Sequence, residues 1–155
     1  MTNKKVVQGK EIISKKEFLQ INRNGAKAMS DDLELQSDAK NVLIRADEHR
    51  WVYQGSWFGE PVINLPQDMF ALQDIIWKTK PDYIIEIGVA WGGGILFEAM
   101  LLDYLDGEKV IGLDIFIPLD LRDRLMSHKK LSERIILVEG DSTSDSTIEK
   151  VKSIL

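Results

Sequence analysis

The sequence predicts an α/β fold built on a parallel β-sheet, and three observations support this prediction. Between residues 81 and 155, three short apolar runs alternate with helical patterns. A glycine-rich segment follows the first run, and an acidic residue lies at or just beyond the end of each run. Alternation of strands and helices builds right-handed βαβ units, in which the strands lie parallel in one sheet.

The length and composition fit one domain of a soluble protein. The chain has 155 residues, of which 44% are hydrophobic and 29% are charged, and ordinary domains have about 100–150 residues. It has no cysteine, which excludes disulfide frameworks, thiolate zinc sites and cysteine nucleophiles. No apolar run reaches the roughly 18 residues of a membrane-spanning helix, and no signal-peptide pattern begins the chain. We therefore expect a cytoplasmic protein without a membrane span.

The net charge of −5 is unevenly distributed along the chain. Residues 1–29 carry seven basic and two acidic side chains, a net charge of +5, so the remaining 126 residues carry −10. The negative charge of residues 30–155 does not favour a polyanion as the main partner, so we expect no binding of nucleic acid. Lysines spread over the first 29 residues are typical of a solvated helix or tail.

Residues 1–53 are predicted to form a helical N-terminal extension. From Lys10 onward, apolar residues recur at spacings of three and four, as in amphipathic helices. The pair Asn24-Gly25 predicts a break in this pattern. A second helix is expected to begin near residues 30–32, because short polar side chains cap free amides and acids suit the positive end of a helix.

Residues 54–80 are predicted to form an aromatic lead-in loop followed by a helix. The loop extends from Gln54 to Asp68 and is rich in glycine and proline. The helix is expected to begin at Asp68 and to end before Pro81, because the residue before a proline disfavours helical geometry. Aromatic residues near the loop could form the wall of a pocket or simply pack beneath the segment. They are Trp51, Tyr53, Trp57 and Phe58.

Residues 81–155 are predicted to form the first half of a nucleotide-binding α/β domain. Strands are expected over residues 83–87, 109–113 and 134–138, because these runs are apolar and rich in β-branched side chains. A helix over residues 95–105 is expected to close at Gly107, and Ser146 with Glu149 could form a capping box for a last helix.

Only the strands on one side of the first strand are encoded in this stretch. A doubly wound nucleotide fold pairs strands on both sides of its first strand, and an uncovered apolar edge favours aggregation. We therefore expect either that these residues are the N-terminal part of a longer protein or that another segment pairs this edge. Pairing of two copies at the edge would give a homo-oligomer.

The segment from Glu86 to Gly94 is the most informative part of the sequence. Its four glycines allow a tight turn and close approach of a ligand, next to the free amides of a helix start. No lysine follows the glycines, so this is not the phosphate loop of an ATPase. The dinucleotide signature G-x-G-x-x-G would fall on Gly88, Ala90 and Gly93, and the alanine removes the glycine that gives the pyrophosphate room, which disfavours NAD.

Two further acids follow the second and third predicted strands. Asp114 lies 20 positions beyond Gly94, where an acidic side chain can accept the hydroxyls of an adenosine ribose. Asp141 lies three residues beyond the third strand. Each acid also has a local alternative: Glu86 could accept backbone N–H groups of the turn, and Asp114 and Asp141 could cap turns. Together, however, the three acids share the sheet edge at which open α/β sheets bind ligands.

The spacing E-x-G-x-x-x-G, on Glu86, Gly88 and Gly92, resembles the first motif of class I S-adenosylmethionine methyltransferases. Over residues 51–141 the resemblance narrows to the cephalosporin hydroxylase / rhamnosyl O-methyltransferase family. The residues that carry it are Trp57-x-Gly59, Pro66-x-Asp68, Gln73, Ile76, Pro81-Asp82, Ile85-Glu86-x-Gly88 and Gly92-Gly93. Members have a Gly-Gly-Ser turn, and Gly94 replaces that serine here.

This resemblance implies a Rossmann-like sheet of the methyltransferase type and S-adenosylmethionine as cofactor. It implies O-methylation of a hydroxyl on a small molecule, sugar or glycolipid, in some members with Mg²⁺, and it places Asp141 near the adenine. The family's base and metal residues would lie beyond Leu155, so no catalytic or metal-binding residue is predicted here; His49 and His128 are isolated. The predicted cofactor-binding residues are Glu86, Gly88, Ala90, Gly92, Gly93, Asp114 and Asp141.

Two other readings of the sequence remain open. Gly88, Gly93 and Asp114 would also suit an NAD-dependent oxidoreductase. Alternatively, the chain is a non-catalytic binding module on a truncated sheet, in which residues 51–58 or the bare strand edge bind a partner protein.

Overall fold

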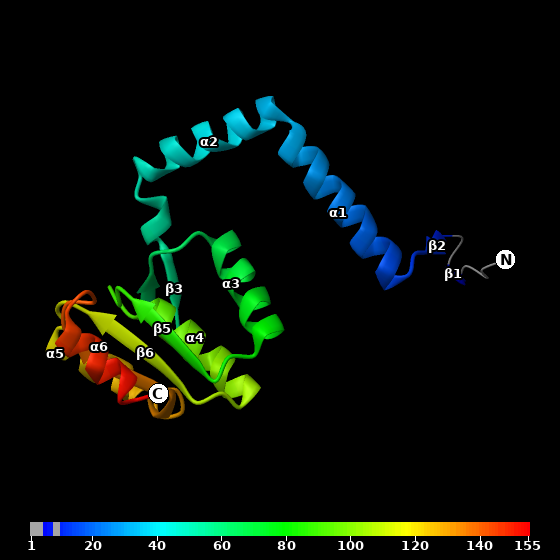
Figure 1. Cartoon of the computed structure of the whole chain (residues 1–155). Coiled ribbons are helices and arrows are strands. Elements are labelled where there is room, and N and C mark those ends of the chain that lie inside the picture. The colour runs from blue at the N-terminus through cyan, green and yellow to red at the C-terminus, as the bar shows by residue number, and fades with distance from the viewer. Residues whose placement is uncertain (1–4, 8–9) are drawn as a thin grey trace. The chain divides into compact units, whose positions relative to one another are not determined.

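The computed structural model describes residues 5–7 and 10–155 (Figure 1). The chain divides into two compact units, residues 1–49 and residues 50–155. The finer division of the sequence at residues 53 and 80 stays a prediction.

The first unit contains a short β-ribbon and two helices. Strands β1 (Lys5–Val7) and β2 (Lys10–Ile12) pair antiparallel, and helices α1 (Lys15–Asp31) and α2 (Leu33–Asp47) follow. The prediction that helix begins at Lys10 is therefore wrong. Helix α1 starts only after Ser14, because Ser14 and Glu17 form a capping box in which each side chain accepts the other residue's backbone N–H, at 3.2 and 2.8 Å.

The predicted break at Asn24-Gly25 is also wrong, since α1 continues through both residues. The Gln20 side chain donates to Asn24 Oδ1 at 2.9 Å, which supports this turn of the helix. A single glycine weakens a helix by about 1 kcal/mol but does not end it. The interruption lies at Asp32, whose side chain accepts the backbone N–H of Leu35 at 3.0 Å and caps α2, within the predicted region.

Replacing Gly25 with alanine is expected to stabilise α1 by about 1 kcal/mol, because alanine loses less backbone entropy than glycine. A Cβ at this position would meet no atom within 4 Å. Amide hydrogen exchange should slow by about fivefold in α1, while the amides of the second unit serve as the internal control. Unchanged exchange in α1 would contradict the expectation.

The second unit is built on a three-stranded parallel sheet in the order β5-β6-β7. The strands are β5 (Tyr83–Ile87), β6 (Lys109–Asp114) and β7 (Ile135–Glu139). Their type, order and direction confirm the predicted α/β fold. Arg134, predicted as the start of the third strand, instead closes a 3₁₀ turn, Ser132–Arg134, and its side chain bonds Asp103 at 3.3 Å.

Four helices accompany the sheet in Figure 1: α3 (Pro66–Thr79), α4 (Gly93–Leu105), α5 (Leu119–Ser127) and α6 (Asp145–Lys152). Helices α4 and α5 bury apolar side chains against one face of the sheet, and α6 packs on the other face through Val151. As predicted, α3 ends before Pro81, but it begins at Pro66 and not at the predicted Asp68. None of the helices in the described part of the chain is long and apolar enough to cross a membrane.

Residues 54–68 differ from the predicted loop. They contain a β-hairpin of β3 (Gly55–Trp57) and β4 (Glu60–Val62). Phe58 and Gly59 form its two-residue turn with positive φ angles of 50° and 93°, as the right-handed twist of a tight hairpin requires. The sequence signal was weak because Phe-Gly stands where Asn-Gly or Asp-Gly is usual.

The predicted capping box of Ser146 and Glu149 is wrong as well. The N-cap of α6 is Ser144, whose hydroxyl accepts the backbone N–H of Thr147 at 3.3 Å. The cap forms earlier because the turn of residues 141–144 already brings the Ser144 backbone N–H to the Asp141 carbonyl, at 3.1 Å.

Strand β5 pairs with β6 on one side, and no other described strand lies on its second side. Ile85 and Ile87 on this strand are 45% and 68% exposed. The bare apolar edge expected from the sequence is therefore present among the described residues.

Candidate functional site

The turn between β5 and α4 carries the glycines predicted to hold a cofactor. Gly88, Ala90 and Gly92 have positive φ angles of 96°, 47° and 87°, so the backbone reverses within a few residues. A Cβ at Gly88 would meet nothing within 4 Å, which leaves this position open to a ligand. Ala90 adopts a left-handed conformation that costs a non-glycine residue about 1–2 kcal/mol.

Gly92 and Gly93 have a packing role in the structure. A Cβ on Gly92 would lie 2.7 Å from Leu125 Cδ2, and one on Gly93 would lie 2.7 Å from the Glu60 carbonyl oxygen and against that of Pro61. Both glycines are buried. They allow the start of α4 to approach β4 and α5, and their predicted contact with a cofactor stays a prediction.

Asp114, at the end of β6, holds the glycine turn in place. Its Oδ2 accepts the backbone N–H groups of Val89 and Ala90 at 2.8 and 3.3 Å, and its Oδ1 accepts that of Phe116 at 3.4 Å. An ionised carboxylate offers about four acceptor positions, so one remains. The local capping role foreseen for Asp114 is present, and one ribose hydroxyl can still be accepted alongside it.

Asp141 fixes the turn after β7. Its Oδ1 accepts the backbone N–H and the hydroxyl of Thr143, at 2.8 and 2.7 Å. These hydrogen bonds hold the pKa of Asp141 below its usual range. The side chain is therefore ionised at neutral pH and available as an acceptor at the sheet edge.

Two cavities meet at Ile87 and Gly88. The strand-end cavity, about 240 Å³, lies among the carboxyl ends of the three parallel strands and includes Asp114 and Asp141. The turn cavity, about 210 Å³, shares Ile87 and Gly88 with the first cavity and includes Glu86 and Ala90. The structure thus brings five of the seven predicted residues to one pair of adjoining cavities, from which only Gly92 and Gly93 are absent.

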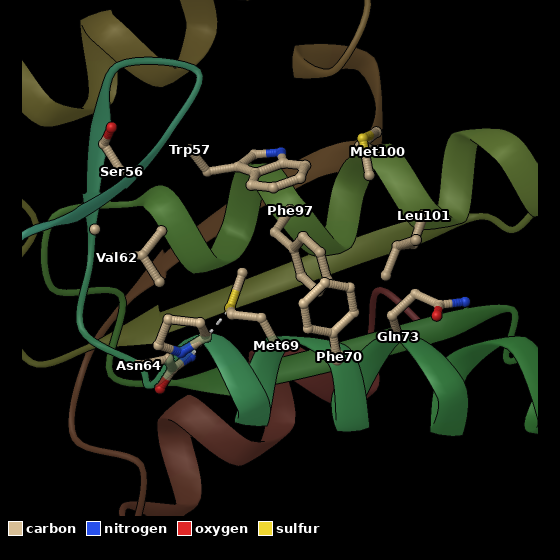
Figure 2. Close-up of a pocket in the computed structure, with 12 residues that line it drawn as sticks. Ser56, Trp57, Val62, Asn64, Met69, Phe70, Gln73, Phe97, Met100 and Leu101 are labelled. Carbon is tan, nitrogen blue, oxygen red and sulfur yellow. Dashed lines mark hydrogen bonds between the residues drawn. The ribbon is translucent and has the colours of Figure 1, made fainter. Parts of the chain in front are cut away.

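A third cavity, about 380 Å³, is apolar and lies between the β3–β4 hairpin, α3 and α4. Figure 2 shows Trp57, Phe97, Met69 and Phe70 around it. The rings of Trp57 and Phe97 meet edge to face, with centroids 5.0 Å apart. Of the four aromatic residues proposed as a pocket wall, Trp57 lines this cavity; Trp51, Tyr53 and Phe58 do not.

A further acid, which the sequence did not single out, is Glu98 on α4, whose charge acts on Glu86. Glu98 is only 6% exposed, and burial raises its pKa to about 7. Burial, followed by the nearby charge of Glu98, raises the pKa of Glu86 to about 8. A carboxylate in an otherwise apolar helical run, Ile95 to Met100, is the signal that could have drawn attention to Glu98.

The raised pKa values predict a pH-dependent stability. In the unfolded chain both carboxyls have their ordinary pKa of 4.5. Between about pH 5 and 8 the folded protein therefore binds more protons than the unfolded chain. The pair therefore stabilises the fold at low pH, and this contribution is lost as the pH rises. Replacing Glu98 with glutamine removes one of these two carboxyls. The free energy of unfolding of Glu98→Gln minus that of the natural chain should therefore be larger at pH 8 than at pH 5, by on the order of 2 kcal/mol.

Urea unfolding at both pH values measures this effect. Glu108→Gln, at an exposed carboxyl before β6, is the matched control and should change little. An equal effect of Glu98→Gln at pH 5 and pH 8 would contradict the prediction.

No group of three or more metal-ligating side chains that could hold an ion occurs in residues 5–7 and 10–155. His128 lies against the ring of Phe58, with centroids 6.4 Å apart. His49 lies in the other unit, beside Arg50 at the division between the two.

Comparison with known proteins identifies the family. Residues 49–155 match the family described as Rhamnosyl O-methyltransferase/CmcI. Rhamnosyl O-methyltransferase of Mycobacterium leprae (strain TN) is 26% identical over 123 residues, which cover 72% of this chain and 49% of that protein. The chain thus spans about half the length of the curated relative that it matches. No solved structure gives a significant match. The chain belongs to the rhamnosyl O-methyltransferase/CmcI family, a family of O-methyltransferases.

Proposed function

We propose that this chain binds the methyl donor of an S-adenosylmethionine-dependent O-methyltransferase whose acceptor is a hydroxyl of a small molecule, sugar or glycolipid. The observation that carries the proposal is the pair of cavities that share Gly88 in their linings, with acids from the ends of three successive strands around them. Ligands of open α/β sheets bind at this edge. The name of the Mycobacterium leprae relative supports a sugar acceptor.

An elongated donor suits the two cavities. Its adenosine would lie in the strand-end cavity, between Asp114 and Asp141, and its amino-acid end in the more polar turn cavity beside Glu86. The middle of the molecule would cross Gly88, where no side chain stands in the way. When bound, S-adenosylmethionine supplies an electrophilic methyl group on a sulfonium.

The residues of this chain contribute positioning. Asp114 ties the turn to the end of β6, so that the turn and the ribose acceptor form one rigid unit. Holding a donor in a fixed orientation supplies a large part of the rate of a transfer reaction. We assign no catalytic base among the described residues.

The acceptor would be recognised partly by aromatic and apolar surface. Trp91 lines the turn cavity and is exposed, and a sugar ring can stack on such a face. The apolar cavity beside Trp57 suits the apolar part of a glycolipid. The lack of cysteine favours the cytoplasm as the place of this activity.

Calorimetric titration with S-adenosylhomocysteine, the demethylated donor, tests the proposal, and fluorescence titration with NADH tests its main alternative. We expect micromolar binding of S-adenosylhomocysteine and no binding of NADH, because Ala90 occupies the position of the second dinucleotide glycine. Binding of NADH alone would support an oxidoreductase instead. Binding of neither, with association into dimers in light scattering, would support the non-catalytic module.

A further inference from the structure

Helix α1 of the first unit carries an exposed apolar face. Phe18, Ile21 and Met29 recur along it at helical spacing and are 51%, 56% and 56% exposed. Gly25 lies on the same face, and a Cβ there would meet no atom within 4 Å. No residue of α1 is buried. A surface helix usually packs such a stripe against a core, so the face of α1 is available to a partner.

The opposite face of α1 is basic. Lys16, Arg23 and Lys27 follow one another at intervals of seven and four residues, which places them on the side of the helix opposite Phe18 and Ile21. All three are exposed. None of the three forms an ion pair with a described residue. Their charges are therefore free to attract an anionic partner.

The acids of α1 lie at its two ends. Glu17 accepts the Ser14 backbone N–H in the capping box, and Asp31 is the last residue of the helix. The turns between them, residues 18–30, carry only positive charge. Helix α2 has three acidic and two basic residues, a net charge of −1. Of the two helices, only α1 combines an apolar face with a basic one.

An anionic lipid surface fits both faces of α1. Helices with Lys and Arg on one face and bulky apolar side chains on the other lie in the plane of a membrane interface, with the apolar face buried at the boundary of the acyl chains. The cations then lie near the charged head groups. A nucleic acid would use only the basic face, and an apolar protein groove would use only the apolar face.

We propose that α1 binds the surface of an anionic phospholipid bilayer. Phe18, Ile21 and Met29 enter the interface, while the lipid head groups attract the basic face. The helix lies along the surface and does not cross the bilayer. Helix α1 is outside residues 49–155, the part of the chain that matches the methyltransferase family. The inference therefore goes beyond the proposed function and does not depend on the methyl donor.

Flotation of the whole chain with lipid vesicles tests the inference. We expect binding to vesicles of phosphatidylglycerol and phosphatidylcholine in equal amounts, and much weaker binding to vesicles of phosphatidylcholine alone. The binding should weaken as the salt concentration rises, because salt screens the attraction between the cations and the head groups. Absence of binding to the anionic vesicles would overturn the inference and leave the proposed function standing.

Two double variants compare the cations of α1 with those of α2. Lys16→Gln with Lys27→Gln should weaken binding by about 25-fold, because each cation near an anionic surface contributes about a factor of five. Lys40→Gln with Arg45→Gln removes two exposed cations from α2 and should weaken it much less. Glutamine has a helix propensity close to that of lysine, and circular dichroism checks that the helices remain. Equal losses in the two variants would overturn the inference, since overall charge would then govern binding.

The double variant Phe18→Gln with Ile21→Gln tests the apolar face and keeps every charge of the chain. We expect the affinity for the anionic vesicles to fall by at least about tenfold, because two bulky apolar side chains no longer enter the interface. Val42→Gln with Leu43→Gln, at exposed apolar residues of α2, is the matched control and should bind as the natural chain does. Unchanged binding in the α1 variant would overturn the inference.

Light scattering without vesicles tests the competing occupant, a second copy of the chain. We expect Phe18→Gln with Ile21→Gln to leave the oligomeric state of the natural chain unchanged. Conversion of a homo-oligomer into a monomer by this variant would assign the apolar face of α1 to contacts between copies and would overturn the inference.

Discussion

Gly93→Ala is expected to lower the free energy of unfolding of the second unit by about 3 kcal/mol, at the upper end of the range for overpacked cores. The new Cβ would lie 2.7 Å from the Glu60 carbonyl oxygen and also against that of Pro61. These atoms belong to the backbone of β4 and cannot rotate away. The start of α4 or the β3–β4 hairpin would have to shift.

Urea unfolding followed by tryptophan fluorescence measures the loss, since Trp57 lies on this hairpin. Gly94→Ala is the matched control, because the three atoms nearest to its Cβ would all belong to the carboxyl group of Glu86, the far end of a flexible side chain. We expect a much smaller loss of stability in this neighbour. Equal losses in the two variants would show that helix propensity, and not the approach of β4, governs Gly93.

Asp114→Ala is expected to weaken binding of S-adenosylhomocysteine by about 10- to 100-fold, the effect of losing a hydrogen bond to a charged acceptor. It should also loosen the glycine turn, because Val89 and Ala90 lose the acceptor of their backbone N–H groups. Calorimetry measures the affinity, and thermal unfolding measures the stability lost when the turn loses these hydrogen bonds.

Asp114→Asn separates the two roles of the carboxylate. The amide oxygen can still accept the N–H groups of Val89 and Ala90, whereas the amide nitrogen can accept neither a ribose hydroxyl nor the N–H of Phe116, whose 3.4 Å bond to Oδ1 is lost. We therefore expect a smaller loss of stability than in Asp114→Ala, with an affinity reduced by at least several-fold. Unchanged affinity in Asp114→Asn would leave Asp114 with the local role of holding the turn.

Local sequence patterns were sufficient to predict secondary structure where it depends only on residues within one element. The β-branched run of residues 83–87 is β5, and the end of α3 before Pro81 follows from the geometry of the residue preceding proline. The predictions from local patterns were wrong where the surrounding residues override a local signal. Gly25 did not end α1, and the turn at Phe58-Gly59 lacked the usual residues.

The candidate site divides in the same way. The sequence predicted that Glu86, Asp114 and Asp141 share one edge, because the carboxyl ends of parallel strands meet there. It did not predict that Asp114 holds the glycine turn, or that Gly92 and Gly93 lie against packed neighbours. Hydrogen bonds between different strands and loops depend on how the elements pack.

The sequence by itself determined the family, the strand–helix alternation and the glycine turn, because these depend on residues close together in the chain. Only the tertiary structure placed Glu98 where its charge acts on Glu86, brought β4 against Gly93 and formed two cavities that share Gly88. The physical reason is that the burial and charge of a side chain depend on neighbours from other elements. The spacing of residues within one element does not specify those neighbours.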